Sequence, residues 1–451
     1  MKYFFILFLS ILFLSACKKF VDIDQPPTSI TSSQVFDTDT KATAAILGIY
    51  SNMINNGNQF SNWWITAYVG LYSDELARYN PTTEHTEFQT NQLSQFTGIV
   101  QDAWSSIYKT IYSANAAIEG LEQSTRLTSS LKSQLLGEAK FIRAFCYFYL
   151  VNLYGDVPLV LTTDYKANAT LPRTLTGEVY NQIKADLLFA KDNMSPTYIA
   201  VGTGTRVRPN KWAAVALLAR VYLFQKEWRN AEDAATEVLA SNLYTPLQHC
   251  SAVFLRNSTE TIWQLGQTAT TVREFSQAFQ TAGSPKWYFT SFIMSSFQQN
   301  DIRRSAWVDS ITVSAVKYYY PGKYKVTANA QYQMVLRAAE QFLIRAEARA
   351  NQNNLAGAIA DLNTIRTRVN LSSLANTLTQ AQVLSAVEQE RKIEFMAEWG
   401  TRWFDLKRTE KAGSMLISTK PSINWQNTDI VWPIPFDELV ANINLIQNPG
   451  Y

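Results

Sequence analysis

The chain has 451 residues and a formal net charge of +3, from 40 Lys and Arg against 37 Asp and Glu. Charges so nearly balanced give no reason to expect a nucleic-acid partner or a polybasic membrane patch. The two histidines, His85 and His249, lie far apart and have no metal-ligand spacing. We therefore expect no metal, no cofactor and no nucleic acid.

The first residues have the features of a bacterial lipoprotein signal. Residues 3–16 are almost entirely apolar, but the run is too short to span a membrane, which takes about 20 residues. It ends in Leu14-Ser15-Ala16-Cys17, which has the pattern of a lipobox. We predict a signal peptide over 1–16, a lipid anchor at Cys17 and an extended tether over 17–36. An ordinary signal peptide that contains a cysteine is the alternative.

Helical periodicity begins at Thr40 and dominates to about residue 245. The segment Leu131–Tyr154 is apolar almost all round in its second half, so it is predicted to be a buried helix. Gly155, with Pro158 close behind, marks its end. The other helices predicted in this part are residues 40–53, 63–79, 100–122 and 178–193.

Two later segments, residues 211–244 and 338–369, resemble each other. In each, small residues recur where two helices joined by a tight turn would cross, which is the tetratricopeptide pattern. Residues 246–335 between them contain glycines, prolines and short β-rich pieces at 261–265 and 316–320. This stretch is predicted to be an irregular insertion within a single domain over 37–451.

With Cys17 acylated, Cys146 and Cys250 are the cysteines that remain. Cys146 lies in the apolar part of the helix predicted over 131–154, so we expect an inert, buried thiol. A Cys146–Cys250 disulfide formed after export is the alternative.

Several short motifs follow one another along nearly the whole chain. They are the lipobox, Pro26-Pro27-Thr28, Arg143–Leu150 leading into Leu153–Leu159, Glu178-Val179-Tyr180, Arg345–Ala348, Glu390-Arg391, Glu398–Arg408 and the ending Gln447–Tyr451. In this order they resemble the SusD/RagB family of Bacteroidetes outer-membrane lipoproteins. One departure is that Lys18 and Lys19 directly follow the lipid cysteine, where acidic residues are common in surface-exported lipoproteins of this group.

The resemblance implies a mainly α fold. It would be an α-α superhelix of tetratricopeptide-like helix pairs with a loop-rich, partly β, irregular half that carries the ligand surface. Members of the family sit on a SusC-like TonB-dependent transporter and hand it oligosaccharides. We therefore expect an outer-membrane lipoprotein, facing the cell exterior, that binds nutrient glycans and is not an enzyme. A peptide-binding RagB-like lipoprotein and a helical scaffold that binds only protein are the alternatives.

Two regions are implied for the ligand. The first is a loop from Arg78-Tyr79-Asn80 to Asn91, and the second is Trp287-Tyr288-Phe289, with Trp307 as a weaker candidate. A sugar requires planar stacking surfaces and polar partners such as Arg and Asn, which these segments supply. The alternative for Arg78 is an ion pair with Asp74, one turn earlier on the predicted helix.

Two further groups are interpreted as structural. Glu394, Arg402, Asp405 and Arg408 have a helical spacing that suits ion pairs holding a helix to the core, rather than a catalytic cluster. The aromatic residues Trp63, Trp64, Tyr68 and Tyr72 have spacings that suit core packing.

Overall fold

The computed structural model describes residues 32–55, 57, 59–199, 206–256, 258–267, 278–279, 283–325, 331–420 and 423–451. The predicted signal peptide and the lipid anchor at Cys17 lie outside these residues. The predicted tether is wrong over its last part, because Ser32–Val35 form helix α2. The chain joins the scaffold there, since the ring of Phe36 is buried directly over Gly120.

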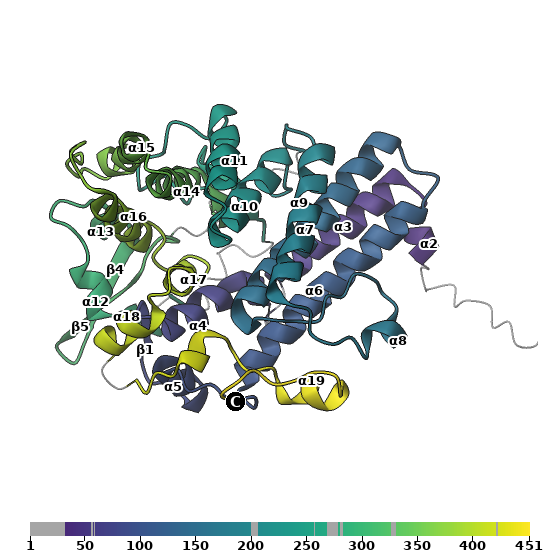
Figure 1. Ribbon diagram of the computed structural model, residues 1–451, viewed down its shortest axis with the longest axis horizontal. Coiled ribbons are helices and arrows are strands. Elements are labelled where there is room, and N and C mark those ends of the chain that lie inside the picture. Colours follow the sequence, from purple (N-terminus) through teal and green to yellow (C-terminus); the bar gives the residue numbers. More distant parts are fainter. Residues whose placement is uncertain are drawn as a thin grey trace, which may run out of the picture.

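Long helices form the scaffold and pack against one another in series (Figure 1). Their bounds are α3 (Asp39–Asn55), α6 (Gly98–Gln123), α7 (Ser129–Tyr154), α9 (Thr176–Asn193), α10 (Lys211–Phe224), α11 (Trp228–Ala240), α14 (Ala338–Asn351), α15 (Leu355–Arg368) and α16 (Gln380–Glu394). The predicted helices at 40–53, 100–122, 131–154 and 178–193 are confirmed to within two residues at each end. The pairs α10–α11 and α14–α15 confirm the two repeat-like segments, and the fold is the mainly α superhelix that was predicted.

Helix α7 forms the centre of the scaffold. From Leu135 to Tyr154 nearly every side chain on it is buried, and α6 and α9 pack along it. Cys146 on this helix and Cys250 are both buried, and both are free thiols, so the disulfide alternative is wrong. The inert, buried thiol predicted for Cys146 fits its surroundings, because burial raises the pKa of this thiol far above the ordinary value.

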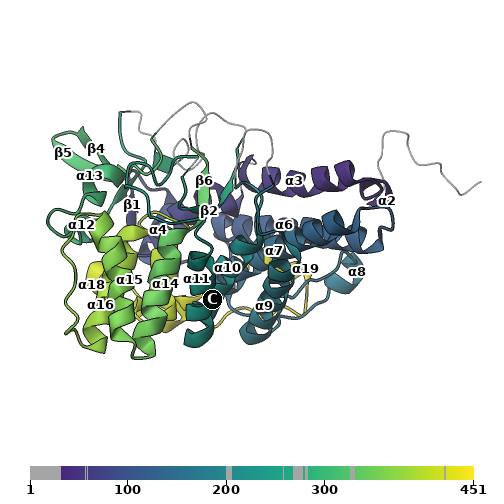
Figure 2. The same ribbon diagram turned by 90° about the horizontal axis from the view of Figure 1, so that it is seen from above.

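Shorter elements complete the chain. The helices are η3 (Phe60–Trp64), α4 (Ile65–Tyr72), α5 (Thr83–Thr90), α8 (Tyr165–Asn168), α12 (Ser291–Ser295), α13 (Arg303–Trp307), α17 (Thr401–Arg408), α18 (Ala412–Thr419), η5 (Asn427–Ile430) and α19 (Phe436–Ala441). The strands are β1 (Leu76–Arg78), β2 (Thr261–Leu265), β3 (Trp287–Phe289), β4 (Val308–Val313), β5 (Val316–Pro321) and β6 (Gln333–Arg337). Figures 1 and 2 place β1, β4 and β5 at the end of the molecule remote from α2.

The strands of the described residues form antiparallel pairs, β1 with β3, β2 with β6, and β4 with β5. The predicted β-rich pieces at 261–265 and 316–320 correspond to β2 and β5. The helix predicted over 63–79 is wrong at its end, because α4 stops at Tyr72 and Leu76–Arg78 form β1. The backbone there is held by a distant partner, since Thr290 donates its N–H to the Glu75 carbonyl at 3.1 Å.

Within the described residues, no helix combines the length and the apolar character that crossing a bilayer requires. The expected core aromatics are confirmed for Trp64, Tyr68 and Tyr72, which are buried. Trp63 is only partly buried, although it packs against the same core.

Candidate ligand-binding site

The two regions predicted from the sequence lie side by side. Strands β1 and β3 pair in register, with Arg78 opposite Trp287 and Ala77 opposite Tyr288. The pairing continues by one step, because the Tyr79 N–H donates to the Lys286 carbonyl at 3.0 Å. A two-stranded ribbon therefore carries most of the predicted ligand residues.

Side chains alternate between the two faces of a strand, and this divides the predicted residues into two groups. On one face, the Arg78 guanidinium lies over the Trp287 ring, 5.2 Å from its centroid. The same Trp287 ring contacts Tyr68 and His85 edge-on, at 5.2 and 5.3 Å between centroids. We call Arg78, Trp287, Tyr68 and His85 the arginine face.

The opposite face carries a cluster of tyrosines. Tyr79 and Tyr288 both contact the ring of Tyr318, with centroid distances of 5.4 and 5.0 Å and interplanar angles of 82° and 75°. All three rings are half-buried, so part of each remains in contact with solvent. We call these residues the tyrosine cluster. Tyr318 comes from β5, and it was not among the predicted site residues, although its segment was predicted to be a β-rich piece.

Several predicted site residues lie beneath the surface. Trp287 is 2%, Phe289 3% and Asn91 1% exposed. Asn91 adopts a left-handed conformation (φ 58°) at the end of α5, where its side chain donates to the Tyr72 carbonyl and accepts from Lys420. In this structure these buried side chains pack beneath the ribbon or hold the end of α5. Trp307 is also buried, and its indole N–H donates to the Cys250 carbonyl.

Arg78 is a cation without a carboxylate partner. The alternative ion pair with Asp74 does not form, because Arg402 binds both oxygens of Asp74, at 2.8 and 2.7 Å. No hydrogen bond or ion pair of Arg78 occurs with any described residue, and its Nε atom is buried and unpartnered. Partial burial lowers the pKa of this guanidinium, which nevertheless remains charged at neutral pH.

His85 belongs to a helix that the sequence prediction missed. Residues 78–91 were predicted to form a loop, but α5 begins within them through a capping box, in which Thr82 accepts from the His85 N–H and donates its own N–H to His85 Nδ1. Because Nδ1 accepts this proton, the ring proton is on Nε2. Burial, with the charge of Arg78, lowers the pKa of His85 to about 4, so the ring is neutral at neutral pH. Thr82 at an N-cap was the available signal for this helix.

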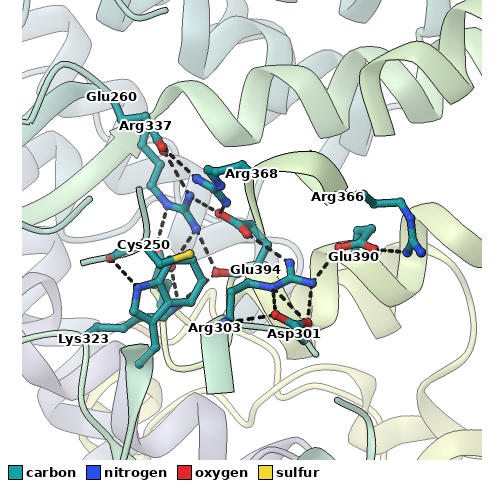
Figure 3. A network of polar contacts seen from close by, with 12 residues as sticks. Cys250, Glu260, Asp301, Arg303, Lys323, Arg337, Arg366, Arg368, Glu390 and Glu394 are labelled. Carbon is teal, nitrogen blue, oxygen red and sulfur yellow. Dashed lines mark hydrogen bonds and ion pairs between the residues drawn. The ribbon is translucent and has the colours of Figure 1, made fainter. Parts of the chain in front are cut away.

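The acidic and basic residues near the end of the chain form buried ion pairs, as predicted. Asp405 is held by Arg391 and Arg408, and Arg402 holds Asp74. Glu394 lies in a larger network drawn in Figure 3, where it accepts from several arginines. Carboxylates bound in this way are unavailable as general acids or bases. Among the described residues, no group of three or more His, Cys, Asp and Glu is arranged to hold a metal ion.

A second aromatic surface lies elsewhere on the scaffold. A groove of about 510 Å³ between α6, α8 and α19 is lined by residues that include Trp104, Tyr108, Tyr112 and Tyr165. Tyr165 is 73% exposed. This groove was not among the regions predicted from the sequence, and its aromatic residues provide an internal comparison for the ribbon.

Comparison with known proteins identifies the family. Residues 19–223 match the family model described as starch-binding associating with outer membrane, and residues 268–451 match that of the SusD family. SusD-like protein P2 of Formosa agariphila is 26% identical over 503 aligned positions, covering 95% of this chain and 96% of that protein. The chain belongs to the SusD family, as the resemblance predicted.

Solved structures share the fold. A SusD superfamily protein from Bacteroides vulgatus has a TM-score of 0.81 at 20% identity, covering 92% of this chain and 99% of that one. A laminarin-binding SusD-like protein has a TM-score of 0.74 at 23% identity, covering 91% of this chain and 99% of that one. The family is one of carbohydrate-binding proteins associated with the outer membrane.

Proposed function

We propose that this protein binds oligosaccharides, without cleaving them, at the ribbon formed by β1 and β3, and delivers them to a SusC-like TonB-dependent transporter. The observation that carries the proposal is the tyrosine cluster, in which Tyr288 of β3 and Tyr318 of β5 meet Tyr79, the residue directly after β1, at one end of the molecule. Partly exposed rings suit the apolar C–H face of a sugar. The laminarin-binding relative of the same fold supports a glycan ligand.

The environment of the ribbon supports binding rather than hydrolysis. A glycosidase needs two carboxyl groups flanking the scissile bond. The acidic residues next to β1 do not meet this requirement, because Asp74 is ion-paired to Arg402 and Glu75 is fully buried. The proposed role of the site is therefore to hold the ligand by stacking and hydrogen bonds, with a dissociation constant of about 10 μM to 1 mM.

Gel retardation and calorimetry of the soluble protein, starting after Cys17, would test this role against panels of polysaccharides and peptides. Tyr318→Ala removes the ring that joins the cluster, so we expect glycan affinity to fall about three- to tenfold. Tyr165→Ala, in the groove between α6 and α8, is the matched control and should leave affinity unchanged.

The outcomes separate the candidate functions. Loss of glycan binding in Tyr165→Ala but not in Tyr318→Ala would move the site to the groove and refute the ribbon. Binding of peptides alone would make the protein a RagB-like peptide binder. Binding of neither would leave a protein-only scaffold, and new reducing ends would indicate hydrolysis.

We propose that the anchor is a lipid on Cys17, which places the protein on the outer membrane facing outward. Cys17→Ser should release the protein from the membrane fraction and abolish incorporation of labelled palmitate. Protease added to intact cells should degrade the wild-type protein. Co-purification of a SusC-like transporter with the anchored protein would support the delivery step, and its absence from gently solubilised membranes would argue against it.

A further inference from the structure

The arginine face contains a positive charge that the described part of the protein does not neutralise. Arg78 is half-buried, where an unpaired charge is costly, and its guanidinium lies over the Trp287 ring without an acidic partner among the described residues. The carboxylate four residues earlier, Asp74, is fully engaged by two hydrogen bonds from Arg402. A partner for Arg78 must therefore come from outside this part of the chain or from solvent.

The other titratable groups nearby form no ion pair with Arg78 in the described part of the chain. Glu75 is buried, and both its carboxylate oxygens are without a hydrogen-bond partner in the described residues. Burial raises the pKa of Glu75 to about 8, so it is predominantly protonated at neutral pH. The Glu84 carboxylate accepts the backbone N–H of Gly98 at 3.1 Å. His85 is neutral and therefore adds neither a positive nor a negative charge.

The donors of the arginine face converge on one ring. The Arg78 guanidinium carbon and the His85 ring centroid lie 5.2 and 5.3 Å from the Trp287 centroid. His85 carries its proton on Nε2, 3.5 Å from the Tyr68 hydroxyl, so this weakly engaged N–H is a second donor. The planar fork of guanidinium N–H groups matches an anionic group with two oxygens, and the His85 N–H is a further donor at the same Trp287 ring.

We propose that the ligand is an acidic oligosaccharide, whose carboxylate or sulfate group pairs with Arg78 while neighbouring sugar rings contact the tyrosine cluster. This rests on the proposed glycan-binding function and adds the chemical class of the glycan. Arg78 is then a specificity-determining residue, because a neutral glycan would leave its charge without a partner in a half-buried position.

The test compares acidic polysaccharides with their own neutral derivatives on the wild-type protein. Calorimetry and gel retardation would use alginate, polygalacturonate and glucuronoxylan before and after carboxyl reduction, and fucoidan and carrageenan before and after desulfation. Laminarin serves as a neutral reference. We expect at least one acidic probe to bind about tenfold to hundredfold more tightly than its neutralised form. Carboxyl reduction and desulfation distinguish a carboxylate ligand from a sulfate ligand.

Variants then assign the effect to Arg78. Arg78→Gln should reduce affinity for the acidic probe to that for its neutralised form, and Arg78→Lys should retain part of the difference. Lys317→Gln is the matched control, because Lys317 is an exposed cation on β5 whose Nζ lies over the Tyr319 ring, 5.2 Å from its centroid. Lys317→Gln should leave the preference for the acidic probe over its neutralised form intact. Thermal melting would confirm that each variant is folded.

The failures of the two proposals are distinguishable. Equal or tighter binding of neutralised probes or laminarin would overturn the acidic ligand and leave glycan binding standing. An acidic preference that Lys317→Gln abolishes and Arg78→Gln does not would also overturn the role of Arg78. No binding of any glycan, by a folded protein, would overturn both proposals.

Discussion

Glu394→Gln tests whether the buried ion network stabilises the fold. The Glu394 side chain is 0% exposed and accepts from Arg303 at 3.1 Å, from Arg337 at 2.6 Å and from Arg368. In the described part of the chain the surrounding network is electrically balanced. Its acidic members are Glu260, Asp301, Glu390, Glu394 and Glu398, and its basic members are Arg303, Lys323, Arg337, Arg366 and Arg368. The substitution leaves one buried positive charge uncompensated.

Removing one partner of a buried ion pair costs about 3–5 kcal/mol, and this is the expected loss in the free energy of unfolding. Glu388→Gln is the matched control on the same helix. Glu388 pairs with Lys411 and lies 3.9 Å from Arg402, and its side chain is 29% exposed, so its loss should cost at most about 1 kcal/mol. Urea denaturation followed by circular dichroism would measure both values on the soluble protein. A cost for Glu394→Gln no greater than that for Glu388→Gln would refute this account of the network.

The difference in unfolding free energy between wild type and Glu394→Gln should depend on pH. Burial alone would raise the pKa of Glu394, but Arg368, Arg337 and Arg303 hold it well below its ordinary value of 4.5. The unfolded state therefore binds this proton before the folded state does as pH falls. The stability that Glu394 contributes is complete above about pH 4.5 and is lost progressively below it. The difference between wild type and Glu394→Gln should accordingly narrow in acid, and a difference that widened there would contradict the assigned charge state.

Three further predictions concern buried groups. Burial raises the pKa of Glu75 from 4.5 to about 8, so the folded state retains a proton that the unfolded state releases between these values; Glu75→Gln should raise the urea midpoint more at pH 8 than at pH 5. Cys146 and Cys250 are free and buried, so Ellman's reagent should modify them only after unfolding, and rapid reaction of the native protein would contradict their burial. Asn91→Ala removes hydrogen bonds to Tyr72 and Lys420 and a left-handed cap, so it should lower the free energy of unfolding by about 1–3 kcal/mol.

The helical scaffold could be predicted because its signals are local. In α7, apolar periodicity and the Gly155 stop signal lie within the segment itself, and the predicted bounds differ from the observed ones by two residues at most. Strand β1 could not be found in this way. Its backbone is fixed by β3, which is more than two hundred residues away, and by the side chain of Thr290, which donates to the Asp74 carbonyl at 2.6 Å. Tertiary pairing therefore overrode the helical pattern that continues beyond Tyr72.

The sequence could indicate the two segments that pair in the ribbon, but it could not indicate the orientation of their side chains. Arg78, Tyr79 and Tyr288 were identified from composition and family resemblance, and the ribbon places them together. Assigning each to a face required knowing that 76–78 is a strand, since alternation separates Arg78 from Tyr79. A third ring, Tyr318, belongs to a hairpin whose docking against β3 has no signal in the local sequence.

Arg402 binds the segment that precedes the arginine face. It lies on α17, within the motif Glu398–Arg408, and it holds both oxygens of Asp74, four residues before Arg78 in the sequence. Arg402→Met should destabilise the fold by about 3–5 kcal/mol, because it leaves Asp74 buried and unpaired. If the ligand is acidic, the uncompensated Asp74 should also weaken binding of the acidic probe, while its carboxyl-reduced or desulfated form binds as before. Calorimetry with the matched probes would measure this difference. An equal loss for both probes would show that Arg402 supports only the shape of the ribbon and not its charge.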